Sequence, residues 1–283
     1  MPARSPGVTI PGSTDAVREH TGPLPMASRA ARDTRARRWL GVFRLGIAAL
    51  EIVAIFGNYE YVLGFRSFAT NNFFSYFTVQ SAMAAVVVLL IAAVLALVAP
   101  RDPPWLGVVR TLVTVYVLVS GIVFGLIVAQ ASTRDYRVDV PWSDTLLHFV
   151  VPALAMIAWT TDSVIAVNPR VPWSTVGWAL VLPSVWLGYT LIRGADVGWY
   201  PYFFLDEAQV GGYLGVAVYC LLVLVIFVAL TATLVAANHG LARRKERLRA
   251  RWASDAADAS DSPDTSNSPD ASDAPGAPDQ PEP

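Results

Sequence analysis

Six blocks of apolar residues, each close to the length that crosses a bilayer, dominate the middle of this chain. A helix rises 1.5 Å per residue, so roughly 20 residues cross the ~30 Å of hydrocarbon in a membrane. The blocks are continuous and do not alternate apolar with polar residues, which argues against transmembrane strands. Hydrophobic residues make up 54% of the 283 residues and charged residues only 15%, a balance unusual for a soluble domain. We therefore predict an all-α, polytopic membrane helix bundle.

Polar segments rich in proline, glycine and charged residues separate these blocks and limit the predicted membrane helices. The fifth block is the shortest and contains Pro183, so its limits are the least well defined. The predicted helices cover residues 40–59, 74–98, 108–129, 144–167, 174–192 and 211–236.

The distribution of arginine and lysine indicates how the bundle is oriented. One basic cluster lies between residues 29 and 44, at the start of the first span, and another lies between residues 243 and 251, after the sixth. An even number of spans puts both clusters on one side of the membrane. The positive-inside rule places that side in the cytoplasm. We therefore expect a multi-pass cell-membrane protein with both termini in the cytoplasm.

Polar segments flank the membrane domain, which we place at residues 39–237. Residues 1–38 are rich in Pro, Gly, Ser and Arg, and residues 253–283 are rich in Asp, Ser, Pro and Ala. Neither segment can bury enough apolar surface to fold alone, so we predict that both are disordered. Residues 238–252 are basic and continue from the sixth block, which predicts a juxtamembrane helix attracted to anionic lipid.

The cysteine and histidine content excludes several kinds of site. Cys220 is the single cysteine, so no disulfide or cysteine metal site can form within the chain. One intramembrane histidine with scattered carboxylates does not make a zinc signature. We expect no metal, no cofactor and no nucleic-acid partner; membrane lipids are the expected partners.

One histidine, His148, lies inside an apolar block, at the start of the fourth span. Asp144 precedes it by one helical turn, and residues four apart share a helix face, so the two side chains can touch. Pro152 follows by one turn; because proline has no N–H, the carbonyl of His148 loses its helical partner there. A titratable group beside a predicted kink in a membrane helix is either a structural histidine bonded to another helix or a functional group.

Hydroxyl groups open the second span at the same predicted depth as His148. Ser75 and Thr78 are three residues apart and are expected to share a helix face. The simpler interpretation is that each hydroxyl bonds back to a carbonyl of its own helix. The alternative is that one of them is a nucleophile, with His148 as its base and Asp144 orienting the imidazole. The spacing alone does not choose between these interpretations.

A polar and aromatic stretch closes the fifth span. Arg193 could pair with a nearby carboxylate such as Asp144, or hold a carboxylate or phosphate of a substrate. An outer aromatic group forms either an interfacial belt or the lining of a cavity for an acyl chain; its members are Trp199, Tyr200, Tyr202, Phe203 and Phe204. Because the same face of the membrane receives these residues and His148, we expect one shared pocket near the outer interface.

Glu51 lies near the middle of the first span, where an ionisable side chain is costly. It is either a protonated carboxyl bonded to a neighbouring helix, with Gln80 as one candidate partner, or part of a substrate-binding site.

The order of these motifs resembles that of a known family. The sequences FSYFTVQ at 74–80 and DTLLHFVVP at 144–152 open the second and fourth spans, and YTLIRG, GWYPY and FLD follow one another within 189–206. This arrangement is similar to the actinobacterial six-span integral membrane family, which is distantly similar to the androgen-induced membrane proteins of animals. The resemblance covers about residues 39–236.

The resemblance implies an activity and a pair of site residues. The animal proteins are intramembrane threonine hydrolases that cleave fatty acid esters of hydroxy fatty acids with a threonine and a histidine. Their histidine falls on His148, and their threonine falls most naturally on Ser75, or on Thr78 if the register slips by one turn. A serine at this point is a departure from the family pattern.

The leading functional hypothesis is therefore an intramembrane hydrolase of lipid or fatty acid esters. In it Ser75 attacks the ester, His148 acts as base and then as acid, Asp144 orients His148, and Arg193 binds a substrate carboxylate or the oxyanion. The alternatives are a small-solute or proton-coupled transporter, and a non-catalytic lipid-binding membrane protein.

Overall fold

The computed structural model describes residues 26–64, 70–132, 139–165 and 170–261. They form helices joined by short connections, with no strand among them. The helices are α1 (Met26–Leu63), α2 (Thr70–Phe73), α3 (Phe77–Val98), α4 (Pro104–Ser132), α5 (Trp142–Thr145), η1 (Leu146–Val150), α6 (Val151–Ile165), α7 (Thr175–Trp178), α8 (Val181–Val197), η2 (Phe203–Leu205) and α9 (Tyr213–Asp261).

Within the described ranges, six helical segments are long and apolar enough to cross a membrane. Helices α1, α3, α4 and α9 each form one segment. The fourth segment consists of α5, η1 and α6 in succession, and the fifth consists of α7 and α8. The prediction of an all-α bundle with six membrane-spanning helices is confirmed.

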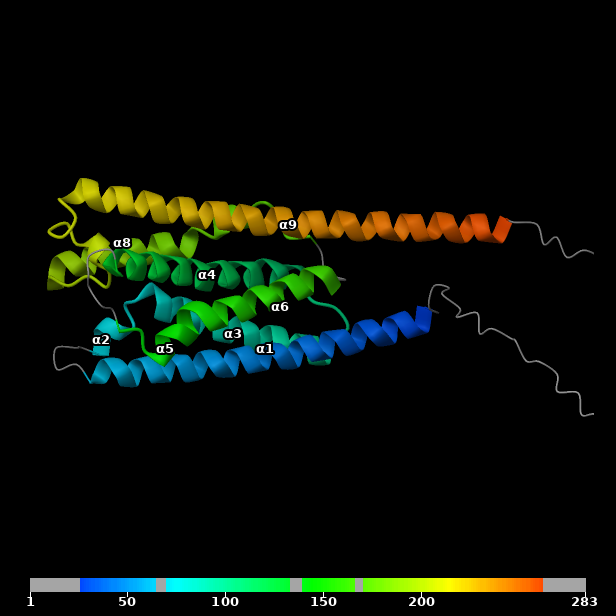
Figure 1. Ribbon diagram of the computed structural model, residues 1–283, viewed down its shortest axis with the longest axis horizontal. Coiled ribbons are helices and arrows are strands. Elements are labelled where there is room, and N and C mark those ends of the chain that lie inside the picture. The colour runs from blue at the N-terminus through cyan, green and yellow to red at the C-terminus, as the bar shows by residue number, and fades with distance from the viewer. Residues whose placement is uncertain (1–25, 65–69, 133–138, 166–169, 262–283) are drawn as a thin grey trace, which may run out of the picture.

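The segments lie side by side as a bundle (Figure 1). Helix α1 runs along one side, where it packs against α3 and α6, and α9 runs along the opposite side, where it packs against α4. The start of α1 and the end of α9 lie at the same end of the bundle. The short elements α2 and α5 lie at the other end, which is where the candidate site is found.

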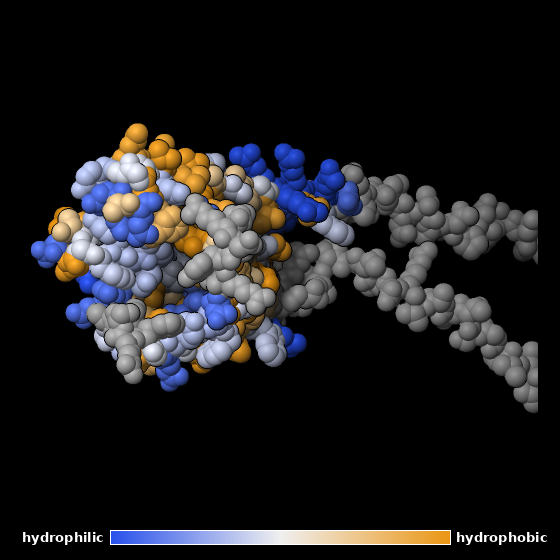
Figure 2. Space-filling model, turned by 60° about the vertical axis from the view of Figure 1, so that its left-hand side comes forward, coloured by the Kyte–Doolittle hydropathy of each residue, from blue (hydrophilic) through white to orange (hydrophobic). Residues whose placement is uncertain are grey.

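Apolar side chains cover the flank of the bundle as well as its interior. Figure 2 shows hydrophobic residues over the flank, and hydrophilic residues on the end turned towards the viewer and where α9 leaves the bundle. Large apolar side chains such as Val185, Ile192 and Leu214 are more than two-thirds exposed. Exposure on this scale suits contact with lipid and is unusual against water.

The interior is held together at one point by interlocking aromatic rings. Phe77 of α3 makes edge-to-face contacts with Tyr116 of α4, Trp186 of α8 and Phe227 of α9. Edge-to-face pairs place the positive edge of one ring against the negative face of another. This cluster fixes the N-terminal turn of α3 against three other helices.

The second span begins later than the sequence suggests. Tyr76, the residue before α3, is extended, with φ −69° and ψ 134°, so the helix starts at Phe77 and Ser75 lies in the preceding turn. Ser75 and Thr78 therefore do not share the face of one helix as expected. A shared face requires a helix that already runs through residue 75, and here the helix starts two residues later.

Both ends of the described chain are helical for longer than expected. Helix α1 begins at Met26, inside the segment predicted to be disordered, and α9 continues without interruption to Asp261. The basic residues 238–252 thus form part of the same helix as the sixth span. Residues 1–25 and 262–283 lie outside the described residues, so the predicted disorder there stays a prediction.

The fifth span is broken near its start. Helix α7 ends at Trp178 and α8 begins at Val181, with a turn between them. Pro183 has no N–H to donate to the carbonyl of Ala179, which explains why a regular helix does not run through this point.

Candidate functional site

The helix that carries His148 is wider than an α-helix. Residues Leu146–Val150 form a π-helix, in which the Val151 N–H donates to the carbonyl of Leu146, five residues back. Pro152 next in the chain cannot donate to the carbonyl of His148, so the regular pattern fails here. Single π-helical turns inside longer helices are often found at functional sites. The kink expected at Pro152 thus takes the form of a wider turn directly before it.

Helix α4 approaches this wide turn more closely than a side chain would allow. Gly121 faces the backbone of His148, and a Cβ added to Gly121 would overlap the carbonyl oxygen of His148. One turn further along α4, Phe124 stacks on the imidazole, with ring centroids 3.9 Å apart and planes 10° apart. The close approach and the stacking together fix the plane of the ring.

The hydrogen bond at one ring nitrogen determines the tautomer of His148. Its Nδ1 lies 3.0 Å from the backbone carbonyl oxygen of Asp144, which can only accept. The neutral ring therefore carries its proton on Nδ1 and presents a lone pair at Nε2. The Asp144 carboxylate lies farther from Nδ1, at 3.9 Å, and accepts instead from Asn58 Nδ2 at 2.5 Å.

The lone pair of His148 faces a hydroxyl of another helix. Nε2 lies 3.4 Å from Thr78 Oγ1, and the ring is 6% exposed. Thr78 Oγ1 also lies 2.8 Å from Ser120 Oγ and 3.4 Å from the hydroxyl of Tyr202. The fold thus brings one imidazole and three hydroxyls together from α3, α4, η1 and the segment before η2.

Thr78 lies in the first turn of α3, where the backbone N–H groups have no carbonyl of their own helix to bond. The Thr78 N–H donates to the Tyr202 hydroxyl at 3.4 Å. The N-terminal turn of a helix also carries a partial positive charge. Negative charge that develops beside Thr78 would therefore be stabilised.

Tyr202 lies outside the membrane-spanning segments and reaches inwards to Thr78. Burial raises the pKa of Tyr202 to about 12, and the hydrogen bonds from Thr78 only partly oppose this. The phenol therefore stays neutral at physiological pH and can donate a hydrogen bond.

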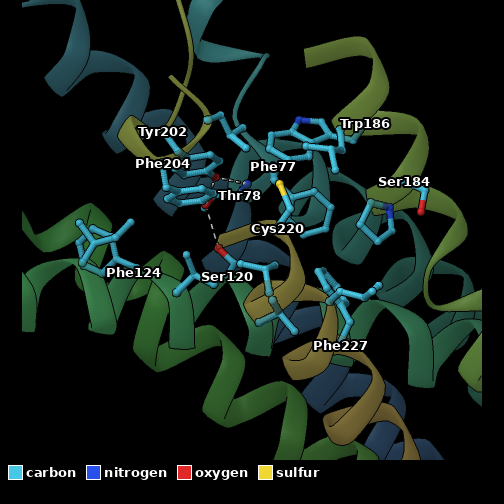
Figure 3. Close-up of a pocket in the computed structure, with 18 of the residues that line it drawn as sticks. Phe77, Thr78, Ser120, Phe124, Ser184, Trp186, Tyr202, Phe204, Cys220 and Phe227 are labelled. Atoms are coloured by element: carbon cyan, nitrogen blue, oxygen red, sulfur yellow. Dashed lines mark hydrogen bonds between the residues drawn. The ribbon is translucent and has the colours of Figure 1, made fainter. Parts of the chain in front are cut away.

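A cavity of about 120 Å³ opens beside this hydroxyl cluster. Thr78, Ser120, Tyr202 and His148 contribute its polar wall, while the remainder is largely apolar and comes from α3, α4, α8, α9 and η2. Figure 3 shows Thr78 between Tyr202 and Ser120, with hydrogen bonds joining the three. A concave apolar space with a few convergent polar groups is typical of a small-molecule site.

Ser75, the first choice of nucleophile, is not brought to His148. Its hydroxyl donates to the carbonyl of Asn71 at 3.0 Å, and its own carbonyl accepts from Trp186 Nε1 at 2.9 Å. Among the described residues that line the cavity, this part of the chain contributes Phe77 and Thr78. The backbone-bonding interpretation therefore describes Ser75, and the alternative residue, Thr78, meets the imidazole.

Arg193 and its aromatic neighbours lie beyond the cavity. Arg193 donates to Asn72 Oδ1 at 2.8 Å, and its guanidinium carbon lies 5.4 Å from the centre of the Trp199 ring. Tyr200 packs over Gly194, where an added Cβ would overlap its ring. The bond to Asn72 ties the end of α8 to α2. Of the outer aromatic group, Tyr202 and Phe204 line the cavity, whereas Trp199 and Tyr200 are not among its lining residues.

Glu51 is completely buried in α1, and neither carboxyl oxygen has a hydrogen-bond partner among the described residues. Gln80, the partner suggested by sequence, donates instead to the carbonyl of Phe74 at 3.1 Å. Seven residues along α1, and so on the same face, Asn58 holds Asp144. Among the described residues, no hydrogen bond joins Glu51 itself to the hydroxyl cluster.

The sequence did not predict Ser120, Phe124 or Asn58 as site residues. In the sequence, Ser120 looks like any hydroxyl that bonds to its own helix. The one signal beside it is Gly121, which permits the close approach of α4 to the backbone of His148. Tyr202 was part of the aromatic group, but its sequence position did not separate it from the interfacial residues. Within the described ranges, His, Cys, Asp and Glu side chains do not gather in groups of three or more that could hold a metal ion.

No family model, no curated protein and no solved structure matches this chain. The fold and the site themselves define a class of protein: a six-span helical membrane protein with a hydroxyl–imidazole pair on the wall of a largely apolar cavity.

Proposed function

We propose that this protein is an intramembrane hydrolase of lipid esters, in which Thr78 is the nucleophile and His148 the general base. The observation that carries the proposal is the geometry of His148: its Nδ1 proton is held by a carbonyl, and its Nε2 lone pair lies 3.4 Å from the Thr78 hydroxyl at the wall of a cavity. In the absence of substrate, catalytic hydrogen bonds are often long and tighten only when substrate binds. A nucleophile, a base and an orienting group are the elements of covalent acyl transfer.

The reaction begins when the ester carbonyl lies against Thr78 in the cavity. His148 Nε2 takes the hydroxyl proton as Thr78 Oγ1 attacks the carbonyl carbon. The tetrahedral intermediate then expels the alcohol, which leaves with the proton from Nε2. The acyl group is now esterified to Thr78. A water molecule, deprotonated by His148, attacks this ester, and the fatty acid leaves as Nε2 returns the proton to Thr78 Oγ1.

Hydrogen-bond donors beside Thr78 suit the charge that develops on the carbonyl oxygen. The Tyr202 hydroxyl is a neutral donor, and Ser120 is a second hydroxyl within 2.8 Å of Thr78. Donors held in place before the reaction stabilise an oxyanion without reorganising. The apolar remainder of the cavity suits an acyl chain.

Asp144 has a smaller role in this scheme than the sequence predicted. Its backbone carbonyl, rather than its carboxylate, makes the shorter contact with His148 Nδ1. The carboxylate holds Asn58 and so ties α1 to the start of the fourth span. Asp144 is a positioning residue, not a catalytic one.

The resemblance to the six-span family agrees with the same pair of residues. The histidine of the distantly similar animal proteins falls on His148, and their threonine falls on Ser75 or Thr78. The contacts of the two hydroxyls favour Thr78, and this choice removes the departure from threonine to serine.

We also propose that both ends of the chain lie in the cytoplasm. Support comes from the basic residues of the extended α9 and of early α1, which lie at the same end of the bundle. The cavity then lies towards the outer face of the membrane.

Hydrolysis of fluorogenic acyl esters by the purified protein tests this proposal. We expect turnover by the wild type, loss of about 10²–10⁴-fold in Thr78→Ala and His148→Ala, and retention in Thr78→Ser. Ser75→Ala is the matched control, because it removes a nearby hydroxyl that bonds only to backbone. Equal activity in wild type and Thr78→Ala would end the proposal.

A non-catalytic lipid-binding role is the second candidate. Thr78 Oγ1 lies closer to Ser120 Oγ, at 2.8 Å, than to His148 Nε2, at 3.4 Å, as expected if the hydroxyls serve only to satisfy one another. In that case lipid extracted with the purified protein would be intact after prolonged incubation, and no ester would be cleaved.

A further inference from the structure

A second group of charged side chains lies in the half of the bundle near the start of α1, away from the hydroxyl cluster. Asp102, between α3 and α4, binds Arg37 at 2.7 Å and Arg110 at 2.5 Å. Arg110 also binds Asp162 of α6 at 2.5 Å, and Asp162 lies 3.1 Å from Arg44 of α1. The five residues form a line of alternating charge that begins and ends with arginine.

This ion network contains three guanidinium groups and two carboxylates, so it has one excess positive charge when all are ionised. At one end, Arg37 reaches the rim, with its side chain 12% exposed. At the other end, Arg44 is 2% exposed within a membrane-spanning helix. An uncompensated charge is costly at such a place, whereas near the rim water screens it.

Arg44 is also the least well bonded member of the ion network. Its Nη2 lies near Asp162 Oδ1 but is buried without a hydrogen-bond partner among the described residues. Its Nη1 makes one long bond, of 3.4 Å, to the carbonyl of Ala92. A guanidinium has five N–H donors, and leaving one unsatisfied in the interior is unfavourable.

A small cavity lies beside the guanidinium groups of this network. Arg44 and Arg110 both line it, and no carboxylate does. The remaining lining is apolar apart from Thr114 and the Trp159 ring, whose N–H already donates to Thr111. Two cations facing an otherwise apolar space attract a negative charge.

The size of the cavity limits what can occupy it. Its volume is about 20 Å³, and a space of about 10–15 Å³ is enough for one water molecule. A monatomic anion is only slightly larger than water and fits, whereas a phosphate or carboxylate group does not. We propose that this cavity, between α1, α3, α4 and α6, binds a single chloride-sized anion that neutralises the excess charge of the ion network.

Thermal unfolding of the full chain in a non-ionic detergent tests the proposal, with chloride exchanged for gluconate at constant ionic strength. We expect a higher Tm in chloride and bromide than in gluconate, rising by about 3 °C for each tenfold increase in chloride above its dissociation constant. Arg44→Leu removes the excess charge and should abolish the chloride dependence. Arg170→Leu removes an arginine from an exposed pair with Glu246 and should leave it unchanged.

Two outcomes would overturn the proposal: equal Tm in chloride and gluconate, or a chloride dependence that survives in Arg44→Leu. If Arg44→Leu does not fold, anomalous scattering from bromide in crystals of the wild type decides. A peak in contact with Arg44 and Arg110 supports the site, and its absence, with water in the cavity, refutes it.

Discussion

Substitution of Gly121 by alanine tests whether the close approach of α4 positions the candidate site. The new Cβ would overlap the carbonyl oxygen of His148. Alanine favours a helix over glycine by about 1 kcal/mol, but overpacking of a well-packed interior costs about 1–3 kcal/mol. Because the overlap is with backbone, which cannot rotate away, we expect the steric cost to dominate. The helix that carries His148 must then move away from α4.

Gly125→Ala is the matched control for this substitution. Gly125 lies one turn further along α4, and the nearest atom to its added Cβ is Phe149 Cε1 at 3.9 Å, an ordinary contact. We expect Gly121→Ala to lower Tm by roughly 2–8 °C and to reduce ester hydrolysis, while Gly125→Ala leaves Tm unchanged or higher. Unfolding monitored by tryptophan fluorescence gives the Tm of both variants, and the fluorogenic ester assay gives their hydrolysis. Equal stability and activity of the two variants would refute the reasoning.

Three further substitutions probe the remaining contacts. Asp144→Asn should reduce hydrolysis less than tenfold, because the backbone carbonyl that holds His148 is retained; a loss as large as that of His148→Ala would show that the carboxylate is required. Tyr202→Phe should lower kcat by about 10²–10³-fold with little change in Tm, if the phenol stabilises the oxyanion; an unchanged kcat would exclude it. Burial alone would raise the pKa of Asp102, but the charge and hydrogen bonds of Arg110, with those of Arg37, outweigh burial and hold it below its ordinary value of 3.8. A depressed pKa contributes stability that is present above 3.8 and is lost as the pH falls through the folded-state pKa. Tm should therefore drop on acidification below about pH 4, and less in Asp102→Asn than in the wild type.

The sequence predicted the spans because apolar length is a property of the chain alone. The blocks that gave six predicted helices correspond to six apolar helical segments in the described residues. The pairing of Asp144 with His148 was also predicted, since it depends only on the four-residue repeat of a helix. The atom that makes the shorter contact was not predicted, because a backbone carbonyl has no signal in the sequence.

Contacts between spans could not be predicted in this way. The meeting of Thr78 with His148 depends on where α3 begins, and the extended residue Tyr76 sets that start. The same shift removes Ser75 from the helix and leaves it bonded to backbone. Ser120 and Tyr202 reach the site through the packing of α4 and of the segment after α8, which no periodicity reveals.

The ion network shows the same limit. Arg44 was interpreted as part of a basic cluster that marks the cytoplasmic side, yet it is buried beside Asp162. A single aspartate within an apolar block gives no indication of its partner. Only the packing of α1 against α6 brings the two together.

The central claim concerns which hydroxyl becomes acylated. Labelling of the purified protein with a fluorophosphonate, followed by mass spectrometry of its peptides, identifies that residue directly. Attachment at Thr78, lost in His148→Ala, is the predicted result. Attachment at Ser75, or no attachment at any hydroxyl beside the cavity, would contradict the account.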